Sequence, residues 1–407
     1  MTQISTVPGG VTAAKGFRAS GVHCGIRKNK TKRDLALIFA DADCAAAAVY
    51  TTNLVQASPI AVTKKHLSNG RARAILANSG NANACAPNGY DHALRSCKAA
   101  AAELGISHED IIVNSTGVIG VELPVEAVEN SVPALVRALS ATGSDEAAEA
   151  IMTTDLTKKE LAVQFTLRGK VVTLGGIAKG SGMIAPHLAT MLSFLTTDCA
   201  ISPDMLRLAL QDSVRLTYNR VAVDGDTSTN DMCAILASGL AENPVIDREG
   251  EDFEAFCDAL RTVNRHLAME IARDGEGATK LVTCAVSGAA NDEAAEILTM
   301  SVIRSPLVKA MLFGADANVG RVLCAMGYSG AAFNPEAVEI LFASEAGDLV
   351  ACRNGVGISF DEAEARRILS QKAVTIQIKL GEGPGEAEAF GCDLTYDYVK
   401  INGDYRS

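Results

Sequence analysis

The amino-acid sequence predicts a layered fold that mixes helices and strands, of the α/β or α+β class. Short apolar segments typical of buried strands alternate irregularly with longer segments that carry apolar residues on one helical face. An all-parallel barrel would require a regular alternation, so we favour stacked layers of helices and sheet. The 407 residues, 48% of them hydrophobic, are enough for a large core and for two or three lobes.

The individual elements follow from local patterns along the chain. Apolar runs predict strands at 35–40, 74–77, 111–113, 161–167, 170–174, 191–195, 221–223, 281–286, 338–342 and 373–380, with a further apolar segment at 45–50. Apolar residues spaced by three or four predict helices at 91–104, 125–141, 146–152, 203–218, 252–273, 305–312 and 361–371. Gly105 ends the first of these helices, and Arg168 and Gly169 form the turn of a hairpin.

Composition narrows the class of protein. The formal net charge of −11 argues against nucleic acid as a bulk partner. No apolar run reaches the roughly 18 residues of a membrane span, and residues 1–10 lack the features of a signal peptide. The 11 cysteines include no C-x-x-C pair, which favours reduced thiols over a metal cage or a disulfide framework. We therefore expect a cytoplasmic protein without a metal or a membrane partner.

Residues 175–202 combine a glycine-rich backbone with a hydroxyl side chain at the mouth of a strand. Residues 175–182 predict a flexible loop that carries Lys179. Thr190 follows, directly before the apolar run 191–195. The glycine spacing matches neither the phosphate-binding G-x-x-x-x-G-K-[ST] loop nor the dinucleotide-binding G-x-G-x-x-G turn, so neither nucleotide motif applies here.

Two polar segments that follow predicted strands are further candidates for a site. Residues 78–83 come after the strand 74–77, where they either line a ligand site or only turn the chain. Thr116 and Gly117 come after the strand 111–113. Backbone N–H groups at such a glycine can converge on an oxyanion, and the alternative is a simple glycine turn.

The segment 224–231 is rich in aspartate and raises the question of calcium. A calcium-binding EF-hand loop needs glycine and glutamate at the positions that Thr229 and Ile235 occupy here, so the calcium interpretation fails. We interpret the segment as a hydrogen-bonded loop, either at the functional site or purely structural.

The motif KGSGMIAP at 179–186, followed by ATML at 189–192, resembles the self-cleavage site of the ornithine acetyltransferase (glutamate N-acetyltransferase) family of arginine biosynthesis. Further blocks resemble the family in the same order, at 78–85, 115–120, 152–155, 223–231, 274–280 and 393–402. Each block alone is a weak signal, but together they extend over essentially the whole chain.

This resemblance implies a fold similar to that of aminopeptidases that cut themselves to free an N-terminal nucleophile. By position, the chain would break between Ala189 and Thr190. The products would be an α chain, 1–189, and a β chain, 190–407, which the family assembles as an α2β2 tetramer.

The resemblance also implies roles for individual residues. Thr190 would be the nucleophile, and Thr116 and Gly117 would form the oxyanion hole. Lys179 suits a substrate carboxylate, and Glu276 suits the side-chain ammonium of ornithine. The full set of implied substrate contacts is Thr153, Lys179, Thr190, Glu276, Asn402 and Ser407, the last in place of a terminal threonine that is common in the family.

The hydroxyl of Thr190 needs a base near neutral pH. His187 is the nearest conventional base, but the family carries no essential histidine there, so we interpret it as a bystander. Cleavage would free the α-amino group of Thr190, and the pKa of such a group, about 7.7–8.0, suits a general base. The implied reaction is ping-pong: Thr190 takes an acetyl group from N2-acetyl-L-ornithine, and L-glutamate then takes it from acetyl-Thr190.

The resemblance implies no cofactor. Some family members also acetylate glutamate from acetyl-coenzyme A, which is therefore an alternative co-substrate. Two other classes of function stay open. A self-processing amide hydrolase or aminopeptidase would use the same Thr190 but pass the acyl group to water, and a binding paralogue would not cut itself.

Overall fold

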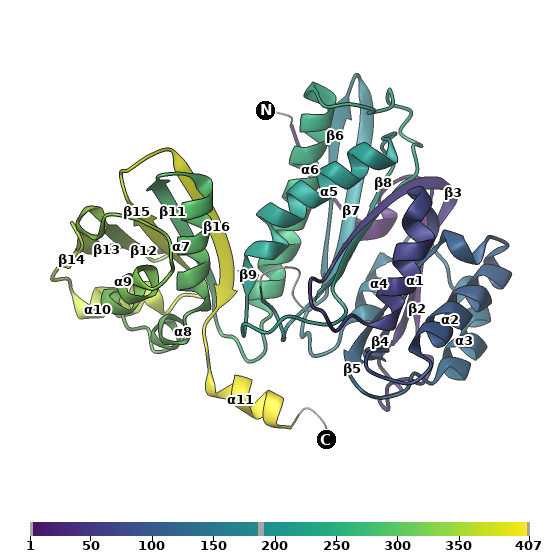
Figure 1. The fold of residues 1–407 in the computed structure, drawn as a ribbon, viewed down its shortest axis with the longest axis horizontal. Coiled ribbons are helices and arrows are strands. Elements are labelled where there is room, and N and C mark those ends of the chain that lie inside the picture. The colour runs from purple at the N-terminus through teal and green to yellow at the C-terminus, as the bar shows by residue number, and fades with distance from the viewer. Residues whose placement is uncertain (1–2, 186–190, 405–407) are drawn as a thin grey trace. The chain divides into compact units, whose positions relative to one another are not determined.

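The chain divides into two compact units in the computed structural model, which describes residues 3–185 and 191–404 (Figure 1). Unit 1 takes the described residues of 1–180, 187–219 and 227–267, and unit 2 takes those of 181–186, 220–226 and 268–407. The chain therefore enters unit 2 briefly at 181 and at 220 before its C-terminal part remains there. Two units agree with the number of lobes expected from chain length.

Unit 1 is built mainly from the first two thirds of the chain. Its strands are β1 (Ser5–Val7), β2 (Phe17–Val22), β3 (Leu35–Tyr50), β4 (Arg71–Asn81), β5 (Ile111–Val118), β6 (Lys159–Leu167), β7 (Lys170–Lys179), β8 (Leu192–Thr197) and β10 (Met232–Ala237). Its helices are α1 (Ser58–His66), α2 (Gly89–Leu104), α3 (Val125–Arg137), α4 (Ser144–Ile151), α5 (Pro203–Leu216) and most of α6 (Glu251–Arg273). Short 3-10 turns are η1 (Gly10–Thr12), η2 (Leu67–Asn69), η3 (His108–Asp110) and η4 (Tyr218–Arg220).

Among the described residues, the nine strands of unit 1 form one sheet in the order β1-β6-β7-β8-β10-β3-β4-β5, with β2 also paired to β3. Strand β8 is antiparallel to β7 and parallel to β10, so Lys179, Leu192 and Met232 lie in one row across the three strands. Strands β4 and β5 are parallel neighbours. Among the candidate site residues, Lys179 lies at the end of β7, and Thr116 and Gly117 lie in the last part of β5.

Helices cover both faces of this sheet. Along β3, Leu35, Leu37 and Phe39 pack in a cluster with residues of α2 and α3. The alternate residues Ala36 and Ile38 pack in a second cluster with residues of α4. Successive side chains of a strand point to opposite faces, so a sheet buried on both sides reads as a continuous apolar run. The layered α/β fold predicted from the sequence is confirmed.

Unit 2 contains the C-terminal elements and the short strand β9 (Val221–Ala222). Its other strands are β11 (Leu281–Ala289), β12 (Glu339–Ser344), β13 (Gly347–Arg353), β14 (Val356–Gly357), β15 (Ala373–Lys379) and β16 (Gly385–Cys392). Its helices are α7 (Asp292–Arg304), α8 (Pro306–Phe313), α9 (Val319–Gly327), α10 (Glu362–Leu369) and α11 (Tyr396–Gly403), with a 3-10 turn η5 (Pro335–Ala337).

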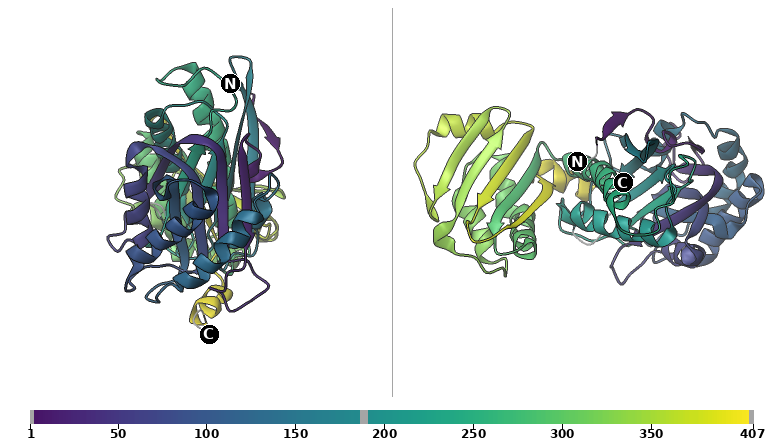
Figure 2. Two further views of the ribbon diagram at one scale, coloured as in Figure 1. Left: turned by 90° about the vertical axis from the view of Figure 1, so that its right-hand side faces the viewer. Right: turned by 90° about the horizontal axis from the view of Figure 1, so that it is seen from above.

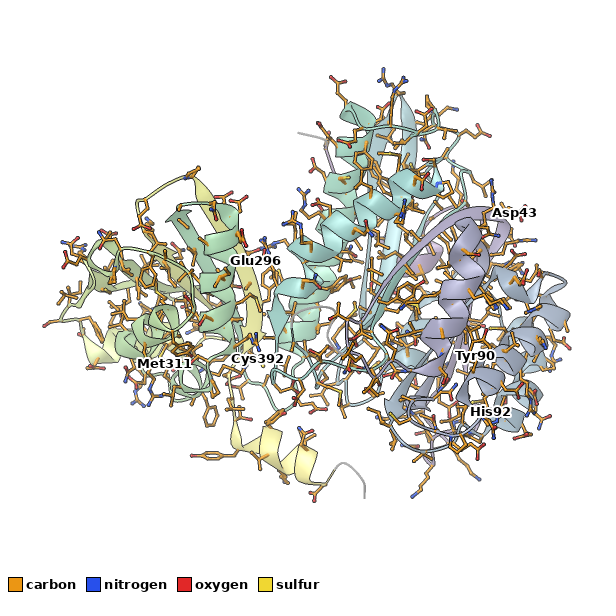
Figure 3. All side chains as sticks on the ribbon, in the orientation of Figure 1. Asp43, Tyr90, His92, Glu296, Met311 and Cys392 are labelled. Carbon is orange, nitrogen blue, oxygen red and sulfur yellow. The ribbon has the colours of Figure 1, made fainter. Side chains whose placement is uncertain are left out.

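Among the described residues, the seven strands of unit 2 form a sheet in the order β14-β13-β12-β15-β11-β16-β9. The right view of Figure 2 shows yellow-green strands of this sheet side by side. Strand β15 alternates between buried and less buried residues, and its buried Val374, Ile376 and Ile378 join the core under α7 and α10. The guanidinium of Arg220 donates to Glu296 on α7 at 2.6 Å (Figure 3), which ties the start of β9 to the unit.

The structure corrects three predictions about glycine-rich and polar segments. Residues 78–81, expected after a strand, are the last part of β4. Residues 175–179, expected in a flexible loop, are the second half of β7. Residues 114–117, expected after a strand, belong to β5. No helix of the described residues has the length and apolar character of a membrane span.

Candidate active site

The strand that follows the expected nucleophile is fixed by its neighbours in unit 1. Ala189 and Thr190, together with His187, lie outside the described residues. Met191 is the first described residue after them, and its backbone N–H donates to Asp231 Oδ1 at 3.1 Å. Its carbonyl oxygen accepts from the N–H of Met232 at 3.2 Å. The carboxylate of Asp231 and the backbone N–H of Met232 therefore hold the start of β8 beside β10.

Lys179 ends strand β7 rather than lying in a loop. A Cβ atom on Gly175 would lie 1.9 Å from the carbonyl oxygen of Gly10, and one on Gly176 would lie 2.4 Å from a methyl of Leu195. These two glycines therefore permit close packing on the two faces of β7 and do not make a turn. Lys179 is 1% exposed and is paired directly with Leu192, the first residue of β8.

A buried carboxylate organises the charges beside Lys179. Asp155 Oδ1 accepts from Lys159 Nζ at 2.8 Å, and both side chains are fully buried. The carboxylate also accepts the backbone N–H groups of Thr153 at 2.9 Å and Gly180 at 2.7 Å. Burial by itself would raise the pKa of Asp155, but Lys179, Lys159 and these hydrogen bonds outweigh it and hold the pKa well below its usual value. Asp155 thus connects the segments of two expected substrate contacts, Thr153 and Lys179.

Replacing Asp155 by asparagine is expected to lower the free energy of unfolding by about 3–5 kcal/mol, because it removes the carboxylate that faces two buried ammonium groups. The pKa of Asp155 is lowered in the folded state, so its contribution is present above the unfolded pKa of 3.8 and is lost as the pH falls below it. The gap between wild type and Asp155→Asn should therefore narrow in acid.

Urea unfolding at several pH values measures this difference. The matched control is Asp145→Asn, which removes the partner of Lys158 from a pair whose two side chains are 40% and 57% exposed. That change is expected to cost no more than about 1 kcal/mol. Equal losses in the two variants would contradict the assignment of Asp155 as the central buried carboxylate.

The expected oxyanion residues lie in the last part of β5. Gly117 has a φ of +135°, and a Cβ atom there would lie 2.3 Å from the carbonyl carbon of Gly80 and 2.5 Å from the nitrogen of Asn81. The register between β4 and β5 also shifts at this point. Only glycine fits both the backbone angle and this close approach. Thr116, just before it, is 3% exposed.

The loop before β10 is hydrogen-bonded to the same end of β5. Asn230 Nδ2 donates to the carbonyl oxygens of Ser115 at 2.7 Å and Ala82 at 2.6 Å. In return, Asn114 Nδ2 donates to the carbonyl oxygen of Asn230 at 2.9 Å. Asn230 is 3% exposed, so these are buried amide bonds. Asn230 therefore positions Ser115, the residue directly before Thr116.

In unit 2, Glu276 lies beside a glycine of the glycine-rich segment. A Cβ atom on Gly182 would lie 2.3 Å from its carboxylate, and Glu276 N donates to Ser181 O at 3.0 Å. Asn402 Nδ2 donates to Glu276 Oε2 at 2.7 Å. Two expected substrate contacts, Glu276 and Asn402, are therefore bonded to each other. Ser407 lies outside the described residues.

The segment that approaches the expected cut is tied down within unit 2. The carboxylate of Asp224 accepts the backbone N–H groups of Met183 at 2.6 Å and Ile184 at 2.8 Å. The carbonyl oxygen of Ile184 accepts from Val223 N at 2.8 Å. Tyr398 donates its hydroxyl to Asp224 Oδ2, the oxygen that also accepts from Met183, at 3.3 Å. Burial raises the pKa of Asp224, and the backbone donors oppose that shift.

Comparison with known proteins decides the family. The model of the ArgJ family matches residues 18–407. The chain belongs to the ArgJ family. It is 51% identical to the arginine biosynthesis bifunctional protein ArgJ of Symbiobacterium thermophilum, over 98% of this chain and 99% of that protein. It is 45% identical to the protein of the same name from Gloeobacter violaceus, over the full length of both.

A solved structure supports the same conclusion. The crystal structure of the arginine biosynthesis bifunctional protein ArgJ from Bacillus halodurans is 46% identical, with a TM-score of 0.50, and aligns over 99% of its own chain with 53% of this one. The resemblance derived from the sequence blocks is therefore confirmed at the level of the family.

Within this ArgJ-family chain, the expected site residues fall into two groups. Thr116, Gly117, Thr153 and Lys179 belong to unit 1, and Glu276 and Asn402 belong to unit 2. The described residues contain no cluster of histidine, cysteine, aspartate or glutamate that could hold a metal ion.

Three aspartates were not singled out by the sequence argument, although they lie in the blocks that carried the resemblance. Asp155 ends the block 152–155, and Asp224 and Asp231 belong to the block 223–231. Their partners are mostly backbone N–H groups of distant segments, which no local pattern reveals. Their position beside glycine-rich or hydroxyl-bearing motifs was the only available signal.

Proposed function

We propose that this member of the ArgJ family cuts itself between Ala189 and Thr190 and then carries an acetyl group on Thr190 from N2-acetyl-L-ornithine to L-glutamate. Membership of the family makes the chain an acyltransferase of arginine biosynthesis. The proposal concerns the route of the acetyl group through the residues of this chain.

The observation that carries the proposal is the adjacency of Asn230 and Asp231. Asn230 binds the backbone directly before Thr116 and Gly117. Asp231 binds the N–H of Met191, the residue directly after Thr190. One dipeptide therefore links the expected oxyanion residues to the strand of the expected nucleophile. Such preorganisation of a nucleophile and oxyanion donors is what acyl transfer requires.

Cleavage would begin with attack of the Thr190 hydroxyl oxygen on the carbonyl carbon of Ala189. The peptide C–N bond breaks, the nitrogen of Thr190 takes the hydroxyl proton, and an ester joins the two residues. Water then hydrolyses the ester and leaves a carboxylate on Ala189 and a free hydroxyl and α-amine on Thr190. The crystallised chain of the Bacillus halodurans protein aligns with 53% of this chain. A chain of that length is consistent with a family whose members consist of separate shorter chains.

The two products would remain interleaved in one sheet. Strand β8, on the C-terminal side of the cut, pairs with β7 from the N-terminal side over 174–179. Strand β10 likewise pairs with β3 over 45–50. The cut would therefore break the covalent link between β7 and β8 without separating the core, because the hydrogen bonds of the sheet and its two buried faces persist.

In each turnover, the Thr190 hydroxyl attacks the acetyl carbonyl of N2-acetyl-L-ornithine while the α-amine takes its proton. Thr116 and Gly117 stabilise the oxyanion, the amide C–N bond breaks, and the proton passes to the departing nitrogen of ornithine. The amino group of glutamate then attacks acetyl-Thr190, and the threonine oxygen leaves with a proton. N-acetylglutamate is released and the enzyme is restored.

We assign substrate recognition to individual charged side chains. Lys179 offers a positive charge to the α-carboxylate that ornithine and glutamate share. Glu276, steadied by Asn402, offers a negative charge to the ammonium that ornithine alone carries at its side-chain end. Thr153 and Ser407 complete the proposed contacts. Acetyl-coenzyme A as a second acetyl donor, the α2β2 assembly and a cytoplasmic location are parts of the same proposal.

The test is to incubate the purified protein with N2-acetyl-L-ornithine and to follow ornithine with and without glutamate. With glutamate, ornithine and N-acetylglutamate should form in equal amounts. Without it, ornithine release should stop near one equivalent per active site, and the fragment 190–407 should gain the mass of one acetyl group. Continued release of ornithine and acetate without glutamate would instead establish the amide hydrolase.

Asp224→Asn is expected to slow self-cleavage by about 10- to 100-fold, because one charge-assisted acceptor for the N–H groups of Met183 and Ile184 is replaced by an amide donor. The rate is measured from the intact masses of the chain as the newly made protein ages. The control is Asp226→Asn, an exposed neighbour in the same loop whose backbone N–H donates to Asp224. Equal cleavage rates in both variants would remove Asp224 from the cleavage step.

A further inference from the structure

Asp231 is a buried carboxyl group in which one oxygen accepts a backbone hydrogen bond and the other accepts none from the described residues. It is 0% exposed, and Oδ1 accepts the N–H of Met191 at 3.1 Å. Within the described parts of the chain, Oδ2 is buried and has no hydrogen-bond partner. A buried polar atom without a partner costs free energy, so its retention calls for a functional explanation.

The charged surroundings of Asp231 come from one direction. Lys179 on β7 is the charged group of the described residues that acts on Asp231, and the same lysine also acts on Asp155, which is paired with Lys159. Two neutral groups also interact with Asp231: the backbone N–H of Met191, just before β8, and Ser228 in its own loop. Burial raises the pKa of Asp231 well above its usual value, and Lys179 opposes that shift only in part.

Connectivity links this carboxyl group to the expected nucleophile through the Thr190–Met191 peptide. The nitrogen of Met191 is bonded to the carbonyl carbon of Thr190, so three covalent bonds separate the nitrogen that Asp231 holds from the α-nitrogen of Thr190. Where Asp231 is ionised, its negative charge favours the protonated form of an amine linked to it by so few bonds, and a protonated amine cannot accept the threonine proton. The charge on Asp231 therefore bears directly on the proposed general base.

We propose that Asp231 is a positioning residue for Thr190: its Oδ1 fixes the Thr190–Met191 peptide, and its charge, shared with Lys179, sets the pH range in which the Thr190 α-amine works as a base. This inference rests on the proposed function, since it assigns a role to the amine that self-cleavage creates. Two separable effects follow. One is geometric and depends on an acceptor oxygen, and the other is electrostatic and depends on the negative charge.

Two substitutions distinguish these effects. Asp231→Asn keeps an acceptor for Met191 but has no charge, so the amine should lose its proton at lower pH. The ascending limb of the pH profile of kcat is then expected to move down by about one pH unit, with KM for N2-acetyl-L-ornithine changed by less than about threefold. Asp231→Ala loses the acceptor as well, and its kcat is expected to fall about 10- to 100-fold at every pH.

The matched control is Asp198→Asn, at the other end of β8. Asp198 is also 0% exposed, and it accepts the backbone N–H groups of Thr173 at 2.7 Å and Lys15 at 3.2 Å. Its pKa is likewise raised by burial. The same substitution there should lower Tm but leave the midpoint of the pH profile in place, because Asp198 has no bond to the start of the strand.

All rates are expressed per cut chain, which intact mass measures. An Asp231→Asn chain that stays uncut while Asp198→Asn is cut also supports the inference, because the same acceptor holds Met191 in the precursor. A cut Asp231→Asn enzyme with the wild-type pH midpoint, or a midpoint shift equal to that of Asp198→Asn, overturns it. Failure of the proposed function looks different: the wild type itself then gives no glutamate-dependent release of ornithine.

Discussion

Thr190→Ala is expected to yield a single uncut chain without acetyl transfer. The substitution removes the hydroxyl that would attack the carbonyl of Ala189, so neither the ester nor the free α-amine of residue 190 can form. The loss in kcat should then exceed the roughly 10²–10⁴-fold that a missing general base alone would cause, since nucleophile and base disappear together. Intact mass under denaturing conditions measures cleavage, and ornithine release measures transfer.

Two further variants make this result specific. Thr190→Ser keeps the hydroxyl and should still cut itself and transfer acetyl, at a lower rate. His187→Ala, which changes only the expected bystander, should cut itself and turn over as the wild type does. A wild-type chain that is uncut and yet fully active would rule out the N-terminal threonine mechanism, because no free amine would exist at Thr190.

Gly117→Ala is expected to reduce kcat by about 100- to 1000-fold, the usual effect of losing an oxyanion donor. Its φ of +135° disfavours any side chain, and the added Cβ would lie 2.3 Å from the carbonyl carbon of Gly80. Strands β4 and β5 must move apart, which displaces the backbone N–H groups that would face the oxyanion. Acetylation of Thr190 in a single turnover reports the loss directly, and circular dichroism checks that the variant is folded.

The control for Gly117 is Gly120→Ala. Gly120 also has a positive φ, of +80°, but a Cβ atom there would meet nothing within 4 Å. It should cost about 1–2 kcal/mol of stability through the backbone alone and leave kcat unchanged. Asn230→Ala complements the pair, because it removes the bonds to Ser115 and Ala82 without crowding β5, and a smaller fall in kcat is expected. Wild-type acetylation in Gly117→Ala would remove this segment from the oxyanion hole.

The proposed cut and the compact units divide the chain differently. The expected α and β chains meet at 189 and 190, whereas unit 1 takes strands from both sides of that bond. Cleavage is therefore better understood as the release of a nucleophile inside one sheet than as the separation of two domains. The buried carboxylates Asp155 and Asp231, which both interact electrostatically with Lys179, come from opposite sides of the proposed cut.

Several elements could be predicted because their cause is local. The strand predicted at 191–195 overlaps β8, Leu192–Thr197, and the periodic segment 252–273 lies within α6, Glu251–Arg273. Helix α2 was also predicted, up to its end at Gly105. In each case burial of a continuous or one-sided apolar pattern determines the conformation, and the pattern is readable within a dozen residues.

Other elements depend on partners that are distant in sequence. The glycines at 175 and 176 were taken for a turn, but they are strand residues whose missing side chains make room for Gly10 and Leu195. The polar residues 114–117 extend β5 because β4 pairs with them and Asn230 donates to the carbonyl oxygen of Ser115. Helix α7 was not predicted, although Asn291 caps it by accepting the N–H of Ala294.

The sequence by itself determined the layered α/β class, the family and the identity of the residues expected at the site, because apolar periodicity and motif blocks are properties of the linear chain. Only the tertiary structure decided which carboxylates surround those residues. Asp155, Asp224 and Asp231 act through backbone N–H groups and lysines brought to them by strand pairing and loop packing. A carboxylate's role depends on what shares its buried space, and that is settled when the sheet forms.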